Sequence, residues 1–189
     1  MPKQILSKAK IIDASIELIR HDQPLTFSDL ARKLGTRPQA LYLYYPNVAA
    51  LKRAIAKDAE TKVVAQIKEQ VGVLTGKDAV KQIISASCEL GLKKPRLSAF
   101  IVTMVQEDKN TPTEYETLLD QYLAVSYKQE KVRVLAKRSL MNVVVGELVN
   151  VGTDRFHLTI IDRKQGLKWM VDTLMAKLDE LDEETPVKE

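Results

Sequence analysis

Three small or apolar residues, Ala31, Gly35 and Leu41, follow one another at intervals of four and six. Ala31 allows a second short helix to approach the first, and Gly35 permits the backbone conformation of a tight turn. Leu41 can fill the space between the two helices. This spacing predicts a helix-turn-helix, whose second helix can lie in the major groove of DNA. A purely structural helical hairpin is the alternative that the spacing leaves open.

Start and stop signals indicate three short helices in the first third of the chain and the beginning of a long one. Each predicted helix begins after a residue that can cap its first turn or at a proline that suits it. These start signals are Ser7, Thr26, Pro38 and Asn47. The segments before Pro24 and Pro46 end the preceding helices, because the residue before proline avoids the helical region.

The excess positive charge lies entirely at the N-terminal end. Residues 1–60 hold ten Lys and Arg against six Asp and Glu, whereas residues 61–189 hold nineteen of each. A basic end on a neutral body suggests a part of the molecule that binds a polyanion. A solvated charged surface explains the same distribution equally well.

The pattern from about residue 8 to residue 55 resembles the DNA-binding domain of the TetR family of bacterial transcriptional repressors. The resemblance rests on LTFSDLA at 25–31 and LYLYYPN at 41–47. Shorter matches lie at residues 11–14, 18–19, 34–35 and 50–51. It implies an N-terminal three-helix DNA-binding head, with the helix that begins at Pro38 as the recognition helix.

The resemblance also implies roles for individual residues. Arg37 would reach guanine or a phosphate, and Gln39 would hydrogen-bond adenine. Tyrosines 42 and 44 would contact the DNA backbone, although the packed face of a short helix is the alternative for both. Family members often carry lysine where Val48 stands, and Lys52 would replace it. The implied DNA-binding residues are Thr26, Arg37, Pro38, Gln39, Ala40, Tyr42, Tyr44, Asn47 and Lys52.

The rest of the chain predicts a helical body. Apolar residues recur at helical spacing, and only seven Gly and seven Pro interrupt them, which favours long helices over a sandwich or barrel. We expect an all-α fold, with a helix-turn-helix domain over 1–50 joined to a larger helical-bundle domain for regulation and dimerisation over 51–189. Body helices are predicted over about 47–71, 77–92, from Pro95, from a cap at Thr111, over 131–151 and from a cap at Asp162. Residues 179–184 are expected to be frayed.

The last two long helices suit a homodimer, since in the family two such helices from each subunit form a four-helix bundle. The residues expected at the dimer interface are Leu140, Val144, Leu148, Leu167, Met170, Leu174 and Leu178. Packing of the Leu167 stripe within its own subunit is the alternative. Residues 139–174 also resemble the WHG type of TetR C-terminal domain around Phe156 and Trp169, although Val145-Gly146 stands in place of a histidine-glycine pair.

A small-molecule effector is expected inside the body. The residues predicted to line its pocket are Cys88, Phe100, Met104, Tyr115, Tyr122, Met141 and Trp169. Plain core packing is the alternative for each, because Met and aromatic residues at helical spacing usually pack. His21 and His157 have no second ligand at metal spacing, so neither a metal nor a cofactor is expected.

Other features narrow the class of protein. One cysteine excludes an intrachain disulfide and fits a reducing cytoplasm. No apolar run approaches the length of a membrane span, and no catalytic motif is recognisable, so neither a membrane protein nor an enzyme is expected. Together with these features, the resemblance to the TetR family implies a cytoplasmic repressor that binds a palindromic operator as a dimer and is released by an effector. A protein–protein interaction module, and more remotely an enzyme using the body pocket, are the alternatives.

Overall fold

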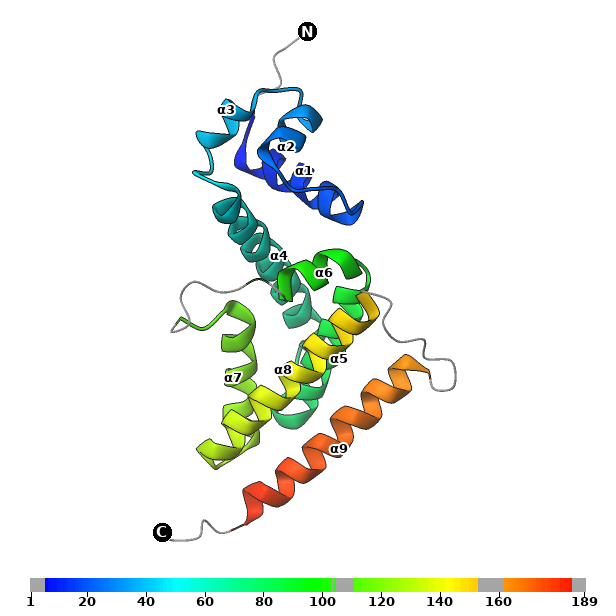
Figure 1. The fold of residues 1–189 in the computed structure, drawn as a ribbon. Helices are drawn as coiled ribbons and strands as arrows, with labels where there is room; N and C mark the ends of the chain where they lie inside the picture. Colours follow the sequence, from blue (N-terminus) through cyan, green and yellow to red (C-terminus); the bar gives the residue numbers. More distant parts are fainter. Residues whose placement is uncertain (1–5, 103, 105–110, 153–161, 185–189) are drawn as a thin grey trace.

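The computed structural model describes residues 6–102, 104, 111–152 and 162–184, and nine α-helices with no strand account for the regular structure in these residues. They run from a small head at the N-terminal end to a larger body (Figure 1). The prediction of an all-α fold is therefore confirmed.

The head consists of α1 (Lys8–Arg20), α2 (Phe27–Lys33), α3 (Pro38–Tyr42) and the first turns of α4 (Val48–Val71). Apolar side chains from all four helices form its core, and this packing is needed because α1, α2 and α3 are too short to be stable on their own. The fully buried members of this core are Ile11, Leu30, Leu41, Leu51 and Ile55.

Local polar contacts define where the head helices begin. The side chains of Ser7, Thr26 and Asn47 accept hydrogen bonds from backbone N–H groups in the first turns of α1, α2 and α4. Such bonds satisfy N–H groups that have no partner within a helix. The three caps predicted from the sequence are confirmed.

The turn between α2 and α3 has the geometry that the spacing predicted. Gly35 adopts a φ of +63°, in the left-handed region that favours glycine. The N–H of Thr36 then donates to the carbonyl of Ala31 at 2.9 Å, which closes the turn. Ala31 is buried, so α3 can pack closely on α2.

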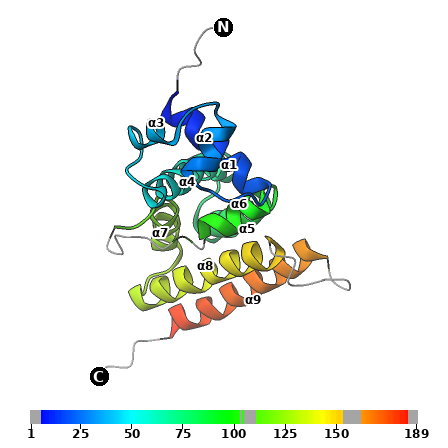
Figure 2. The same cartoon turned by 45° about the horizontal axis from the view of Figure 1, so that its top comes forward.

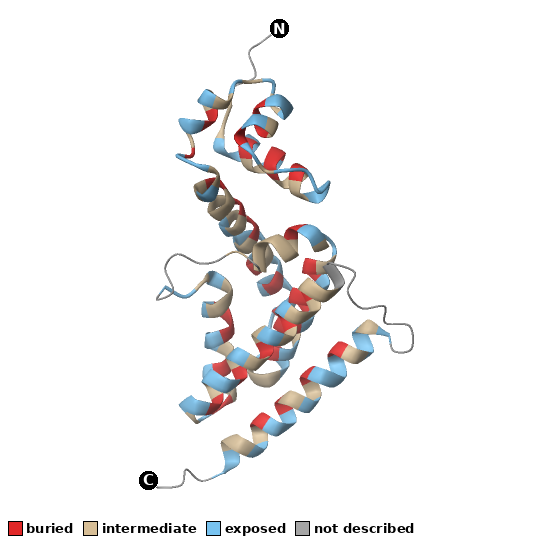
Figure 3. Cartoon of the chain, viewed as in Figure 1, coloured by how far each residue is buried: buried red, intermediate tan, exposed pale blue. Residues whose placement is uncertain are grey.

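The body is built around α5 (Gly76–Leu92), which packs against α4, α6 (Pro95–Val102), α7 (Glu114–Ser126), α8 (Glu130–Gly152) and α9 (Arg163–Glu183). In Figure 2, α8 and α9 lie side by side. Mainly apolar side chains form a second core, and buried residues face inward from these helices (Figure 3). Fully buried members include Ile83, Ile84, Leu119, Ala136 and Leu140.

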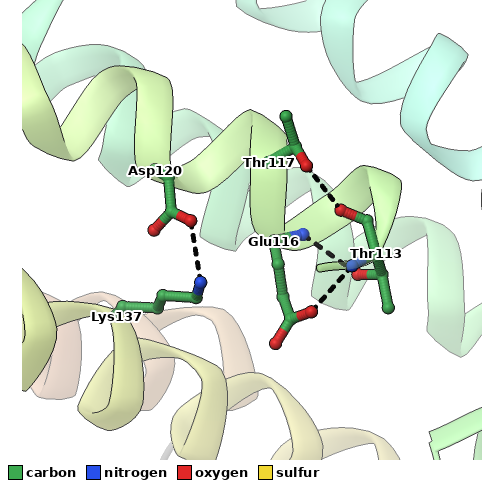
Figure 4. Close-up of polar contacts among 5 residues, drawn as sticks. All are labelled: Thr113, Glu116, Thr117, Asp120 and Lys137. Carbon is green, nitrogen blue, oxygen red and sulfur yellow. Dashed lines mark hydrogen bonds and ion pairs between the residues drawn. The ribbon is translucent and has the colours of Figure 1, made fainter. Parts of the chain in front are cut away.

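The start of α7 corrects one prediction. Thr113, and not Thr111, caps this helix, because it forms a reciprocal capping box with Glu116. The Thr113 hydroxyl accepts the Glu116 N–H at 3.1 Å, and the Glu116 carboxylate accepts the Thr113 N–H at 2.8 Å (Figure 4). Lys137 of α8 pairs with Asp120 of α7 at 2.8 Å and joins the two helices.

Both ends of α9 differ from the prediction. Asp162 stands at the cap position, but its side chain makes no capping hydrogen bond within the described residues. Residues 179–183 are helical and not frayed, because Asp182 accepts the backbone N–H groups of Gln129 and Lys128 at 2.8 and 2.9 Å. These hydrogen bonds lower the pKa of Asp182 below its ordinary value.

The residues expected at a dimer interface are mostly occupied within the subunit. Leu174 is partly buried against the body core, and Met170 is 38% exposed. The other five are buried in that core: Leu140, Val144, Leu148, Leu167 and Leu178. This corrects the assignment of those five, because their apolar stripe faces helices of the same chain.

Candidate nucleic-acid interface and ligand cavity

Helix α3, which was expected to be the recognition helix, is short and packs on the head core. Pro38 occupies its first turn, where the missing N–H does no harm, and Leu41 is 0% exposed in the head core. Arg37 and Gln39 are exposed. Their side chains therefore lie on the surface of the head, while the buried leucine fixes the helix that carries them.

Two residues at the end of α3 extend the exposed surface. The ring of Tyr42 packs edge-on against Phe27, with centroids 4.8 Å apart and an interplanar angle of 86°. Tyr42 is nevertheless 57% exposed, and Leu43 beside it is 85% exposed. Sequence reasoning did not select Leu43, since an apolar residue in the middle of a tyrosine-rich segment suggests core.

Several of the predicted contact residues already have partners in the head. The Thr26 hydroxyl donates to Asp29 Oδ2 at 2.6 Å while its oxygen accepts the Asp29 N–H. The Tyr44 hydroxyl donates to the carbonyl of Leu6 at 2.7 Å. Asn47 uses its Oδ1 as a cap, which leaves its amide N–H₂ to donate elsewhere. Tyr44 thus has an intramolecular role that the sequence did not reveal.

A cavity of about 660 Å³ lies in the body between α4, α6, α7 and α8. Its size is typical of a small-molecule site. Apolar side chains form most of its wall. Among them are Val63, Ile101, Val102, Met104, Met141 and Val144.

Polar groups enter this cavity from α4, α5 and α7. The Tyr115 N–H donates to Glu60 at 3.0 Å, and the Tyr115 hydroxyl lies 3.1 Å from Ser87 Oγ. Burial raises the pKa of Tyr115, so its phenol stays protonated near neutral pH. Arg53 and Lys57 of α4 also line the cavity. These α4 residues were not predicted from the sequence, because the helix was expected only to connect the head with the body.

The comparisons with known proteins agree with this geometry. No protein-family model matches the chain. The uncharacterized HTH-type transcriptional regulator YobS of Bacillus subtilis (strain 168) is 23% identical over 187 residues, which cover 94% of this chain and 95% of that protein. A second regulator of that strain, YvdT, is 39% identical over 71 residues, 36% of this chain and 37% of that protein.

Solved structures extend the likeness over almost the whole chain. A TetR variant from Acinetobacter baumannii AYE, solved with minocycline, has a TM-score of 0.72 and 22% identity, covering 97% of this chain and 98% of that one. The chain has the TetR fold. BioQ with its double-stranded DNA operator has a TM-score of 0.65 and 16% identity, covering 92% and 98%. These proteins are regulators and not enzymes, which agrees with the class expected for this chain.

Within the TetR fold, the seven predicted pocket residues divide into four groups, the last of which is Cys88 alone. Met104, Tyr115 and Met141 line the 660 Å³ cavity. Phe100 packs against the head core, and Tyr122 against the body core. Trp169 is 68% exposed on α9, so its predicted place in the pocket is corrected. Phe156 and His157 lie outside the described residues, and the WHG subtype stays a prediction.

Cys88 lines a different space, a groove of about 400 Å³ between α5 and α9. Burial, and to a smaller extent the charge of Glu147, raise the pKa of the Cys88 thiol to about 12. The side chain of Glu147 is 10% exposed and its Oε1 lies 3.5 Å from Arg163 Nε. Burial raises the pKa of Glu147, and the positive charge of Arg163 partly offsets this increase.

We expect Cys88 to be nearly inert toward thiol reagents in the folded protein. Only the thiolate reacts, and a pKa near 12 leaves very little of it at pH 8. Modification by a chromogenic disulfide should be at least about a hundredfold slower than in the urea-unfolded chain. Since Cys88 is the only cysteine, the absorbance reports it alone. Equal rates in the two states would show that the groove opens readily.

Two further findings concern ions and membranes. No group of three or more His, Cys, Asp or Glu in the described residues could hold a metal ion. None of the helices in the described part of the chain combines the length and apolar character that crossing a bilayer requires.

Proposed function

We propose that the chain is a TetR-family transcriptional regulator that binds double-stranded operator DNA and represses transcription. The observation that carries the proposal is α3, which exposes Arg37 and Gln39 above the buried Leu41. The first 60 residues around it hold all of the net positive charge. BioQ, which shares the fold, has been solved with its DNA operator. A DNA-binding regulator of this kind would work in the bacterial cytoplasm.

The contacts divide into those that read bases and those that position the protein. Arg37 would donate to guanine and Gln39 would pair with adenine, while Pro38 and Ala40 would touch thymine methyl groups. Tyr42, the Asn47 amide and Lys52 would meet the DNA backbone, which fixes the register of α3 in the groove. Thr26 could accept but not donate a hydrogen bond there, because its hydroxyl proton is bonded to Asp29.

A homodimer would place two recognition helices on two half-sites of a partly palindromic operator. The outer faces of α8 and α9 support this, because they expose apolar side chains that the subunit leaves uncovered. These residues are Val134, Leu135, Val145, Trp169 and Met170. We therefore move the proposed interface from the buried stripe to this outer face.

An effector in the 660 Å³ cavity would control DNA binding. Both α4 and α6 connect the cavity with the head: Ile55 of α4 and Leu97 of α6 lie in the head core, whereas Glu60 and Val102 line the cavity. Arg96 of α6 also donates to the Arg20 carbonyl at 3.3 Å. An effector that binds more tightly when the heads are wrongly spaced would release the DNA.

We infer a DNA-binding domain over residues 1–50 and a regulatory and dimerisation domain over residues 51–189, with Leu51 and Ile55 of the second domain packed into the head core. The division would fall within the first turn of α4, so that one continuous helix links the two domains. A change in the tilt of α4 at the cavity would then move α3 in the head.

The first test is selection from a random double-stranded DNA pool by the purified full chain without effector. We expect enrichment of an inverted repeat, because a two-fold dimer reads the same half-site twice. If only weak, salt-sensitive binding without enrichment is found, the chain does not read sequence under these conditions. A protein–protein interaction module would then be the better interpretation.

Two substitutions separate base reading from positioning. Gln39→Ala should weaken binding to the selected site by about tenfold and relax the preference at one base position, as expected for the loss of a base contact. Lys52→Ala should instead weaken binding to all sequences and reduce the salt slope by about 1. Binding isotherms at several salt concentrations measure both effects. Unchanged base preference in Gln39→Ala would remove this residue from the reading set.

A further inference from the structure

Three hydroxyl groups in the wall of the body cavity have already committed their protons. Ser98 Oγ donates to the Gly91 carbonyl at 2.7 Å, and Ser87 Oγ donates to the Ile83 carbonyl at 2.6 Å. A hydroxyl has one proton, so the 3.1 Å contact between Ser87 Oγ and the Tyr115 hydroxyl uses the proton of Tyr115. These hydroxyls therefore offer a ligand in the cavity only lone pairs, which favours a ligand that donates hydrogen bonds.

The charged residues of the cavity wall give it a net negative charge. Glu60, Glu114 and Glu116 outnumber the two cations, Arg53 and Lys57. Lys57 is exposed, so water solvates its ammonium group. Glu114 is exposed as well, and Glu116 turns back to the start of its own helix in the capping box. Glu60, which is partly buried, is therefore the carboxylate best placed to meet a ligand.

The Glu60 carboxylate has acceptor capacity that the described part of the chain does not use. It accepts the Tyr115 N–H at 3.0 Å, whereas a carboxylate has about four lone-pair positions. Among the described residues no cation forms an ion pair with it, and this includes Arg53 and Lys57 of the same helix. A carboxylate in partly apolar surroundings is stabilised by a cation beside it. A positively charged group of a ligand would supply that partner.

The rest of the cavity wall selects an apolar body for the ligand. Val63 of α4, Val102 of α6, and Met141 and Val144 of α8 face the space. Moving an apolar chain from water into contact with these side chains is favourable. A ligand that carried a carboxylate would gain the same apolar contacts, but its negative charge would lie in an acidic cavity. The wall thus distinguishes between apolar ligands by the charge and the hydrogen-bond donors of their polar group.

We propose that the cavity binds an apolar amine in its protonated form, whose ammonium group donates to the Glu60 carboxylate and whose apolar body lies against α6 and α8. An ammonium group has three donors and no acceptor, which matches this wall. The proposal rests on the proposed function, because it names the chemical class of the effector. The whole chain carries a net charge of +4, so a preference for a cation would come from the cavity and not from the total charge.

Calorimetric titration of the full chain, without DNA, with three ten-carbon compounds tests the proposal. Decylammonium, 1-decanol and decanoate share an apolar chain and differ in the polar group, and each is used below the concentration at which it forms micelles. Decylammonium should bind at least about tenfold more tightly than decanol, because its hydrogen bond joins two charged groups. Decanoate should bind most weakly, because like charges would then lie close together.

Three substitutions locate the amine. Glu60→Gln keeps an oxygen that accepts the Tyr115 N–H but removes the charge, so it should lower the affinity for decylammonium by about tenfold and that for decanol by less than about twofold. Glu69→Gln is the matched control, because it removes the same charge from an exposed residue of α4 outside the cavity and should change neither affinity. Met141→Gln puts a polar amide of similar size into the apolar wall and should weaken the binding of both compounds.

Thermal unfolding without ligand establishes which variants are folded, and the order of the three compounds in the wild-type chain is a test that needs no variant. Tighter binding of decanoate than of decylammonium would overturn the proposal and point to Arg53 and Lys57 as an anion site. Equal losses in Glu60→Gln and Glu69→Gln, or no binding of any compound, would overturn it as well. Because these titrations contain no DNA, they are independent of the selection experiment, in which the absence of an enriched inverted repeat would contradict the proposed function itself.

Discussion

Replacing Leu41 by alanine is expected to lower the free energy of unfolding by about 2–5 kcal/mol, the range for removing a large buried aliphatic side chain. Leu41 is 0% exposed and lies in the head core with Leu30 and Ala31 of α2. Helix α3, the proposed recognition helix, has five residues, too few to be stable alone, so it depends on this packing. DNA binding should therefore fall together with stability.

The neighbouring Leu43 provides a matched control. It is the same residue type two positions later but is 85% exposed, so Leu43→Ala should change the free energy of unfolding by less than about 0.5 kcal/mol. Urea unfolding followed by circular dichroism measures both variants. Similar losses in the two would contradict the arrangement of α3 described above, because only one of these leucines supports it.

The head could be predicted closely because its determinants are local. Ser7, Thr26 and Asn47 each cap a helix through a residue three positions later, and Gly35 sets the turn by itself. Signals that depend on neighbouring residues are visible in the sequence. The resemblance of residues 8–55 to the TetR family added the expectation that these helices form a DNA-binding head, and the fold of the chain agrees with that family.

Burial in the body could not be predicted residue by residue from the local apolar pattern. Along α4 the spacing between buried residues is not constant: it is four from Ile55 to Ala59 and five from Ala59 to Val64, because the helix has 3.6 residues per turn. In α9, Met175 is buried, whereas Leu174, which was expected at the dimer interface, is partly buried against the same core. An apolar stripe also does not reveal whether its own chain or a partner covers it. Leu140 and Leu167 are buried by other residues of the same chain.

The candidate sites were harder to predict from the sequence, because some of their contacts join residues that are far apart in the chain. Nothing near Tyr44 indicates that its hydroxyl binds Leu6, since the partner comes from the other end of the head. Glu60 became part of the cavity only because α7 packs against α4 and the Tyr115 N–H meets its carboxylate. The proposed base-reading roles of Arg37 and Gln39 came from the resemblance to the TetR family, and the exposure of both side chains on α3 is compatible with those roles.

The close approach of α5 and α8 at the cavity depends on the absence of a side chain at Gly91. A Cβ there would lie 2.5 Å from Leu148 Cδ2 and 3.3 Å from Ser98 Oγ. Because Leu148 also borders the cavity, its side chain would have to turn into that space or push α8 away. We expect Gly91→Ala to lower the free energy of unfolding by about 1–3 kcal/mol, as overpacking does.

The same substitution at Gly146 should raise the free energy of unfolding instead of lowering it. Gly146 lies within α8, and the nearest atom to an added Cβ is Asn150 Nδ2 at 4.0 Å, so alanine fits there. Alanine in place of a helical glycine should stabilise the protein by about 0.5–1 kcal/mol. Thermal and urea unfolding of the two variants give the comparison.

If Gly91→Ala were as stable as Gly146→Ala, Leu148 would have space to move at no cost, and the wall of the cavity between α5 and α8 would be adaptable. A destabilised Gly91→Ala would show a rigid wall, through which an effector of fixed shape could transmit a displacement to α6 and the head.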